Sequence, residues 1–218
     1  MDVNNQYNVL KGYNMLLYFA GSMIMFEPNE ECITDFWTKG ILKNLPVTST
    51  NPNFIKAASQ LRESCLDANF TGRSLHDDYN RLFNGGGNAL APAFESIYKN
   101  HTPVAESVAE FYKAYGWESK FKGKISDDHL GVELLFLTIM IEKYLELDDD
   151  ACRGEMKNEI KRFINKHILS WIPEWNKDVQ VHSRTLSFRG VGQLIVACSE
   201  DIITTFSNGQ VETGKLKN

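Results

Sequence analysis

The sequence contains few cysteines, and no two of them form a C-x-x-C motif. Cys32, Cys65, Cys152 and Cys198 stand far apart in a chain of 218 residues. This spacing excludes a zinc knuckle and a thioredoxin-like redox motif. Each cysteine has apolar neighbours at helical spacing, so we expect four small buried side chains that stay reduced in a cytoplasmic protein.

An excess of positive charge is also missing. The formal net charge is -5 at pH 7, from 23 Lys and Arg against 28 Asp and Glu. A general nucleic-acid binder needs a basic face to neutralise phosphates, so we expect no nucleic-acid partner. An acidic protein is compatible with a basic peptide partner, as most acidic proteins are.

Apolar runs long enough to span a bilayer are not found. Residues 15–26 resemble the core of a signal sequence, but only Asp2 and Lys11 are charged before them, and no small-residue cleavage site follows. The run is too short and too interrupted to cross a membrane. We therefore expect a buried helix at 15–26, a core helix at 128–145 and no stable membrane insertion.

Alternating strand patterns are missing too, whereas helical periodicity runs through most of the chain. We predict an all-α protein, a single globular bundle of roughly nine to ten helices. Asn51-Pro52 is typical of a helix start, and Ser74 with Asp77 is typical of a capping box. Helices are expected at 4–25, 30–42, 52–65, 74–84, 94–99, 104–115, 127–145, 148–167 and 186–206, with a break at 171–175.

These elements predict one domain over residues 1–218. We divide it into an N-terminal part, 1–116, a hinge, 117–127, a C-terminal part, 128–207, and a polar tail, 208–218. The hinge carries Lys120, Lys122, Gly123 and Lys124, which is typical of a polar linker.

Common catalytic motifs are lacking. The Gly85-Gly86-Gly87 triplet has no phosphate-binding lysine and follows no strand, and no G-x-S-x-G elbow occurs. His129 and Glu133 share a helix face, but a metal needs three or four ligands. We interpret Asp127 and Asp128 as helix caps and His129–Glu133 as a local pair. No cofactor, metal or enzymatic activity is expected.

One enzymatic alternative stays open. A helical metal-dependent hydrolase would use His76, Asp77, Asp128 and His129 as its ligands. Two interpretations of Glu95 also stay open. Its carboxylate, next to an aromatic residue and near a helix start, suits a guanidinium partner, or it caps or pairs locally.

Several segments resemble, in order, the TorD/DmsD/NarJ-like family of redox-enzyme maturation chaperones. Asp78-Tyr79-Asn80-Arg81-Leu82-Phe83-Asn84-Gly85 is similar to the family's Y-x-x-L-F-x-G-P. Ala91-Pro92-Ala93-Phe94-Glu95-Ser96-Ile97-Tyr98 resembles P-P-[WY]-E-S-x-Y, and Asp128 to Leu134 resembles P-D-H-[LI]-x-x-E-L. Phe163 to Pro173 resembles F-x-x-x-H-[LI]-x-x-W-x-P. The chain departs from these patterns at Gly86, Ala93, Phe94 and Asp127.

The resemblance implies a cytoplasmic, all-helical chaperone that is not an enzyme. Its partners would be the twin-arginine signal peptide and the apo form of a molybdopterin oxidoreductase of the DMSO/TMAO reductase type. It would support cofactor insertion and prevent premature Tat export, as a monomer or as a homodimer that exchanges helices at the hinge. We predict that the peptide is bound by Tyr79, Leu82, Phe83, Pro92, Phe94, Glu95, Ser96, Tyr98, Asp127, Asp128, His129 and Glu133.

Overall fold

A computed structural model describes residues 3–84, 87–99 and 104–208, and these ranges form ten α-helices and no β-strand. The predicted all-α fold is confirmed. Short turns of π- or 3₁₀-helix lie at Thr34–Thr38, Ile41–Lys43 and Ile164–Ile168. The helices are α1 (Val3–Met25), α2 (Glu30–Ile33), α3 (Pro52–Ser64), α4 (Gly72–Leu82), α5 (Glu95–Tyr98), α6 (Val104–Ala114), α7 (Leu130–Glu146), α8 (Asp150–Phe163), α9 (Ile172–His182) and α10 (Leu186–Asn208). Gly85, Gly86 and the predicted tail from residue 209 lie outside the described residues.

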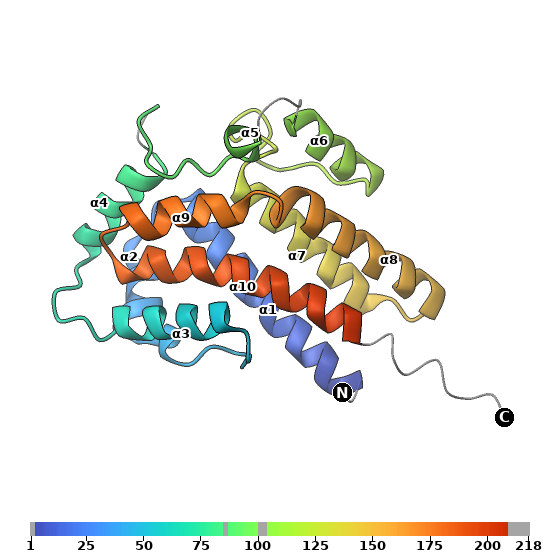
Figure 1. Ribbon diagram of the computed structural model, residues 1–218, viewed down its shortest axis with the longest axis horizontal. Coiled ribbons are helices and arrows are strands. Elements are labelled where there is room, and N and C mark those ends of the chain that lie inside the picture. Colours follow the sequence, from blue (N-terminus) through green and yellow to red (C-terminus); the bar gives the residue numbers. More distant parts are fainter. Residues whose placement is uncertain (1–2, 85–86, 100–103, 209–218) are drawn as a thin grey trace.

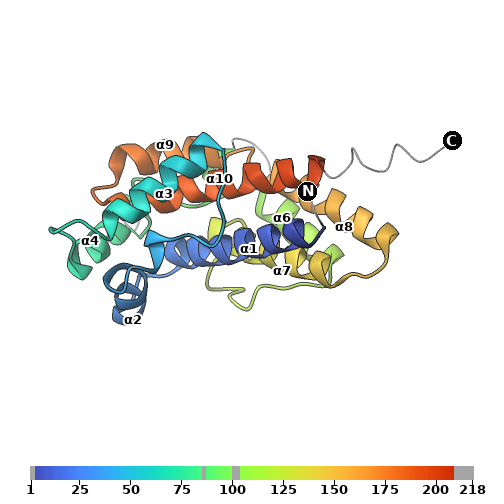
Figure 2. The same ribbon diagram turned by 90° about the horizontal axis from the view of Figure 1, so that it is seen from below.

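The helices pack in two layers around α10 and α1 (Figures 1 and 2). α10 packs against α3, α1 and α9, and α1 packs against α7. Figure 2 shows α3, α9 and α10 on one side of the molecule and α1, α2 and α7 on the other. α1 is therefore covered by α10 and α7 along one side, and its opposite side faces outward.

A glycine permits the close crossing of α1 and α7. A Cβ atom on Gly131 would lie 2.9 Å from the carbonyl oxygen of Gly21 and 2.9 Å from Cβ of Met25. Both distances are shorter than a van der Waals contact, so any larger residue would push the two helices apart. The first turn of α7 is thus held against the C-terminal end of α1.

The sequence predicts some helix ends correctly and others wrongly. Asn51 caps α3, as expected, by accepting a hydrogen bond from the N–H of Asn53 at 2.9 Å, with Pro52 first in the helix. The predicted Ser74–Asp77 capping box is wrong. Thr71 caps α4 instead, and its partner in the capping box is Ser74, three residues later.

The predicted break at 171–175 is misplaced, because the chain is non-helical at 169–171 and residues 172–175 begin α9, with Trp171 as N-cap. Proline is compatible with a first helical turn, where its missing N–H has no partner to lose. Trp171 and Trp175 stand four residues apart and are both buried, so they pack on the same side. Their spacing is helical, and Pro173 starts the helix rather than ending one.

The expectation of four buried cysteines is wrong for Cys152. All four are free thiols, but only Cys198 is buried, and Cys152 is exposed. Cys152 lies in the first turn of α8, away from the buried Ile160 and Phe163 of that helix.

The predicted burial of residues 15–26 holds on only one side of α1. Leu16, Leu17 and Ala20 are buried, whereas 64% of Met15 and 57% of Tyr18 remain exposed. Residues 15–25 of α1 are apolar nearly all round, and the neighbouring helices cover one side only. None of the described helices has both the length and the hydropathy needed to cross a bilayer.

Candidate functional site

Two of the motif segments meet in the fold, although about thirty residues separate them in sequence. Phe94 and His129 form an isolated antiparallel bridge. The N–H of Leu130 donates to the carbonyl of Ala93 at 2.8 Å, and the N–H of Glu95 donates to the carbonyl of Asp128 at 3.0 Å. We call residues 93–95 and 128–130 the crossing. It holds the start of α5 against the start of α7.

The side chains at the crossing cap these two helices. His129 caps α7 because its Nδ1 accepts from the N–H of Gly131 at 3.0 Å. Asp128 instead accepts from the N–H of Ser96, at the start of α5, at 3.1 Å. The prediction that Asp127 and Asp128 cap α7 is therefore wrong. The backbone carbonyl of Asp127 accepts from the hydroxyl of Tyr112 at 2.9 Å.

The imidazole of His129 is neutral at pH 7. Burial lowers its pKa to about 4, although the nearby charge of Asp128 opposes this shift. A neutral ring leaves Nδ1 free to accept the bond from Gly131. The predicted local pair of His129 and Glu133 is not formed, because Nδ1 is used for capping and Glu133 points into the core.

Two carboxylates lie fully buried behind the crossing. Glu95 accepts from Nζ of Lys99 at 2.7 Å, and its other oxygen lies 3.0 Å from Nδ1 of His167. Both oxygens of Glu133 are buried with no hydrogen-bond donor. Burial, and then the charge of Glu95, raises the pKa of Glu133 well above its ordinary value. The folded state therefore favours the protonated form of Glu133.

We expect Glu133→Gln to raise stability at pH 7 to 8. The unfolded chain releases the proton of Glu133 near its ordinary pKa of about 4.3, whereas the folded protein keeps it. Stability of the wild type therefore falls as pH rises above that value, by up to about 1.4 kcal/mol per pH unit until the folded group also ionises. A neutral glutamine removes this loss while keeping the shape.

Urea unfolding of the wild type and Glu133→Gln at pH 4.5 and pH 7.5 measures the difference. The two proteins should converge at pH 4.5 and diverge at pH 7.5. Glu146→Gln, an exposed glutamate on the same helix, is the matched control and should change little. Lower stability of Glu133→Gln at pH 7.5 would show that Glu133 is ionised in the fold.

The residues predicted to bind a peptide differ widely in exposure. Phe83 packs on Trp175, and Tyr98 stacks on Trp171 and donates to Asp178 at 2.8 Å. The hydroxyl of Tyr79 donates to the carbonyl of Met25 at 3.2 Å. Buried are Tyr79, Leu82, Glu95, Asp128, His129 and Glu133; half-buried are Phe83, Pro92, Phe94, Tyr98 and Asp127; exposed is Ser96.

An apolar groove of about 620 Å³ lies elsewhere, on the outward side of α1. Its volume falls in the range of natural ligand sites. The ring of Phe19 packs on that of Phe36, 4.5 Å between centroids, and forms one wall. Sequence reasoning did not find this groove. The lining residues are Asn14, Met15, Tyr18, Phe19, Ser22, Met23, Phe26, Glu27, Pro28, Asn29, Cys32, Phe36 and Glu142.

The rim of the groove is acidic. Glu27 and Glu142 line it, and the described lining contains neither lysine nor arginine. Glu142 accepts from Asn14 at 3.3 Å, and Glu27 accepts from Asn80 at 2.9 Å, so both carboxylates are oriented by neighbours. Glu30 and Glu31 are exposed in α2, next along the chain. The groove thus offers apolar surface beside negative charge.

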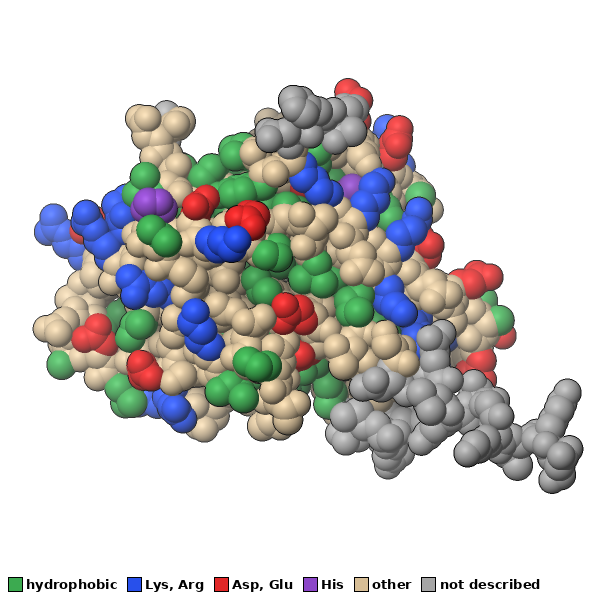
Figure 3. Space-filling model, viewed as in Figure 1, with side chains coloured by type: hydrophobic (Ala, Val, Ile, Leu, Met, Phe, Trp, Pro, Cys, Tyr) green, Lys and Arg blue, Asp and Glu red, His purple; other side chains and the backbone are tan. Residues whose placement is uncertain are grey.

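Helix α8 carries a row of basic side chains. Arg153, Lys157 and Lys161 stand four residues apart and form one row on α8. Figure 3 shows Lys and Arg side chains gathered over α8. A basic peptide would gain less from this row than from the acidic rim of the groove on α1.

The four residues of the hydrolase alternative do not form one cluster. Nδ1 of His76 lies 3.1 Å from Glu27, and Asp77 is exposed, whereas Asp128 and His129 are buried at the crossing. Within residues 3–84, 87–99 and 104–208, no group of three or more His, Cys, Asp or Glu is arranged to hold a metal.

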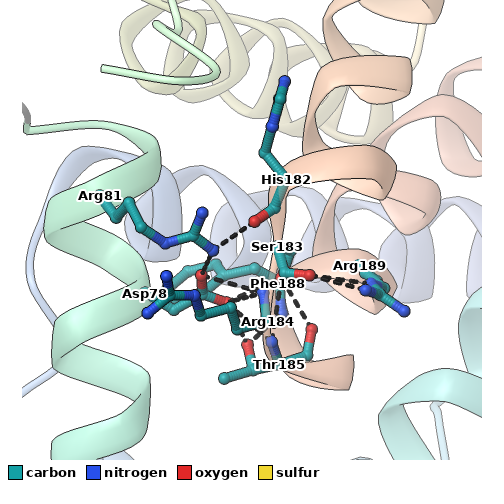
Figure 4. A network of polar contacts seen from close by, with 8 residues as sticks. All are labelled: Asp78, Arg81, His182, Ser183, Arg184, Thr185, Phe188 and Arg189. Atoms are coloured by element: carbon teal, nitrogen blue, oxygen red, sulfur yellow. Dashed lines mark hydrogen bonds and ion pairs between the residues drawn. The ribbon is translucent and has the colours of Figure 1, made fainter. Parts of the chain in front are cut away.

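A second polar network, around Asp78 of α4, was not given a role from the sequence (Figure 4). Its carboxylate is buried and accepts from the N–H groups of Arg184 and Thr185, at 3.0 and 2.9 Å, and from the hydroxyls of Ser183 and Thr185, both at 2.8 Å. Arg81 donates to it at 2.8 Å and also to the carbonyl of His182. Asp78 therefore ties α4 to the turn between α9 and α10.

The sequence matches a known protein family. A family model described as nitrate reductase delta subunit matches residues 49–177, which is more than half of the chain. The matched range includes the Asp78 network's α4, both segments of the crossing and the buried Glu95, Glu133 and His167. No curated protein matches the chain.

Proposed function

The chain belongs to the nitrate reductase delta subunit family, a family of molybdoenzyme maturation chaperones, and on this basis we propose a client and a binding site. The client is the apo form of a molybdopterin oxidoreductase of the DMSO/TMAO reductase type, together with its twin-arginine signal peptide. Binding in the cytoplasm supports insertion of the molybdenum cofactor and prevents premature Tat export. The chaperone itself performs no covalent step.

The acid-rimmed apolar groove on α1 is the observation that supports this proposal best. A signal peptide carries basic residues followed by an apolar segment of 7 to about 15 residues. Its apolar segment suits the surface formed by Met15, Tyr18 and Phe26, and its arginines suit Glu27 and Glu142.

The residues predicted from the family motifs take two roles in this proposal. The buried residues, such as Glu95, Asp128 and Glu133, fix the positions of α5 and α7. They do not contact the peptide, and they affect its binding only by stabilising the fold. Phe94, Tyr98 and Asp127 keep part of their surface in solvent and are candidates for direct contact with the apoenzyme. The proposed function includes no covalent step, so neither group of residues has a catalytic role.

We expect Met15→Ser and Tyr18→Ser each to weaken binding of the signal peptide about tenfold. Each variant removes apolar surface that the peptide would cover, a loss of about 1.4 kcal/mol. Calorimetric titration with the synthetic signal peptide of a molybdopterin oxidoreductase from the same organism measures this. We expect micromolar affinity for the wild type, on the order of -8 kcal/mol.

Leu66→Ser and Ile55→Ser are matched controls for these two variants. Leu66 is 65% exposed and Ile55 57% exposed, as Met15 and Tyr18 are, but neither lines the groove. They should bind like the wild type. If the wild type and all four variants bind the peptide with the same affinity, the peptide binds outside the groove. If none of them binds it, the proposed client is wrong.

A further inference from the structure

One end of the groove is covered by a loop of the same chain. Phe121, in the connection between α6 and α7, packs edge-on against Phe26 with 5.3 Å between ring centroids. Beneath it lies a narrow slot of about 40 Å³. The slot and the groove share Tyr18, Ser22 and Phe26, so they form one continuous surface along α1.

From this contact we propose that residues 118–125, which we call the strap, occupy the end of the groove in the client-free protein and leave it when a client binds. This inference rests on the function proposed above. An apolar side chain of the client takes the place of Phe121. The slot is lined by Leu17, Tyr18, Gly21, Ser22, Met25, Phe26, Gly131 and Leu135, with Lys120 and Phe121 of the strap above them.

The strap is weakly attached to the remainder of the molecule. Among the described residues, each hydrogen bond of residues 118–125 joins two residues of the strap, including Lys122 N–H to the carbonyl of Ser119 at 3.0 Å and Lys124 N–H to the carbonyl of Phe121 at 2.9 Å. Its attachment therefore depends on side-chain packing, chiefly that of Phe121. Such a segment can lift without breaking hydrogen bonds to the bundle.

Glycines flank the packed part of the strap. Gly116 has φ of +64° and Gly123 has φ of +79°, conformations that glycine adopts without strain. A Cβ at either position would meet no other atom within 4 Å, so packing does not restrict them. These two positions can absorb the backbone rotation that lifting Phe121 requires.

The chemistry of the strap is similar to that of the proposed client. Lys120-Phe121-Lys122-Gly123-Lys124 places one aromatic side chain among three exposed lysines. Nζ of Lys120 lies 5.2 Å from the ring centroid of Phe121. The groove beside it is apolar with an acidic rim. The strap and a basic, apolar peptide therefore suit the same surface and compete for it.

We expect Phe121→Ser to bind the signal peptide about five- to tenfold more tightly than the wild type, because binding no longer requires the strap to leave. Lys124→Ser, a change in the same segment that does not touch the slot, should stay within about twofold of the wild type. Calorimetric titration of the full-length proteins measures the three affinities. Equal or weaker binding by Phe121→Ser would contradict the proposal that the strap competes with the peptide.

A neutral apolar dye separates this inference from the client proposal. Nile red should fluoresce more strongly with Phe121→Ser than with the wild type, whether or not a peptide binds. If the peptide binds neither protein while the dye difference persists, the client is wrong and the strap stands. If the peptide binds both proteins equally, the client stands and the strap is wrong.

Hydrogen exchange of the unmodified protein provides an independent measurement. Saturating signal peptide should speed exchange at the amides of residues 119–125, because the strap has left the slot. Slower exchange there would show that the strap closes over the peptide, which contradicts competition.

Discussion

Asp78→Ala should lower the free energy of unfolding by about 3 to 5 kcal/mol at pH 7. The variant leaves the N–H groups of Arg184 and Thr185 and the guanidinium of Arg81 without their buried acceptor. Arg184 and Thr185 belong to the turn between α9 and α10, so the loss acts on the start of the central helix of the bundle. Urea unfolding followed by circular dichroism measures it.

Asp77→Ala is the matched control for this change. The Asp77 side chain is 72% exposed, against 1% for Asp78, and its ion pair with Arg73 is 3.9 Å long. Its removal should change stability by less than about 0.5 kcal/mol. Similar losses in the two variants would show that the Asp78 network does not stabilise the fold.

The effect of Asp78→Ala should depend on pH with a defined sign. Burial by itself raises the pKa of Asp78, but hydrogen bonds from Arg184, Ser183 and Thr185 outweigh it and hold the pKa below its ordinary value. The folded state thus favours the ionised form. This stabilisation is present above pH 4 or so and is lost as pH falls through the folded pKa, where wild type and variant should converge.

Glu95→Ala is expected to destabilise the protein by about 2 to 4 kcal/mol. The change removes the partner of Lys99 and of His167, at 2.7 and 3.0 Å, from a site where Glu95 is 1% exposed. The buried His167, in the turn after α8, then loses this partner, whereas Lys99 keeps its hydrogen bond to the carbonyl of Lys166.

A surface ion pair of similar length gives the comparison for Glu95. Glu174 lies 2.6 Å from Lys177, but both side chains are about two-thirds exposed. Glu174→Ala should change stability by less than about 1 kcal/mol, because water screens the pair. If Glu95→Ala were no more harmful than Glu174→Ala, the buried carboxylates would not hold the crossing together.

Local sequence signals predict the helices well and their tertiary partners poorly. Asn51-Pro52 and the periodic apolar residues of α7 and α10 depend only on neighbours in sequence. The predicted cap of α7 is wrong. Aspartate is a usual capping residue, so the sequence favoured Asp127 and Asp128. Here Asp128 caps a different helix, α5, and His129 takes its place. Only the tertiary fold brings α5 to that position.

The outward face of α1 could not be predicted either. Met15, Tyr18 and Phe26 are as apolar as the buried residues between them, and nothing local shows which side α7 and α10 will cover. The surroundings of Glu133 could not be predicted from its neighbours in sequence, because the carboxylate of Glu95, whose charge acts on it, stands 38 positions earlier in the chain. The family motifs include both segments of the crossing, but they do not show that these segments meet or that six of the twelve residues predicted to bind the peptide are buried.

The position of the bound signal peptide tests the proposed function most directly. A peptide carrying a photoreactive phenylalanine in its apolar segment can be cross-linked to the full-length protein and the attachment sites mapped by mass spectrometry. We expect attachment on α1 and the segment after it, at Met15, Tyr18 or Phe26. Attachment confined to α8, with its row of basic side chains, would contradict the proposed groove.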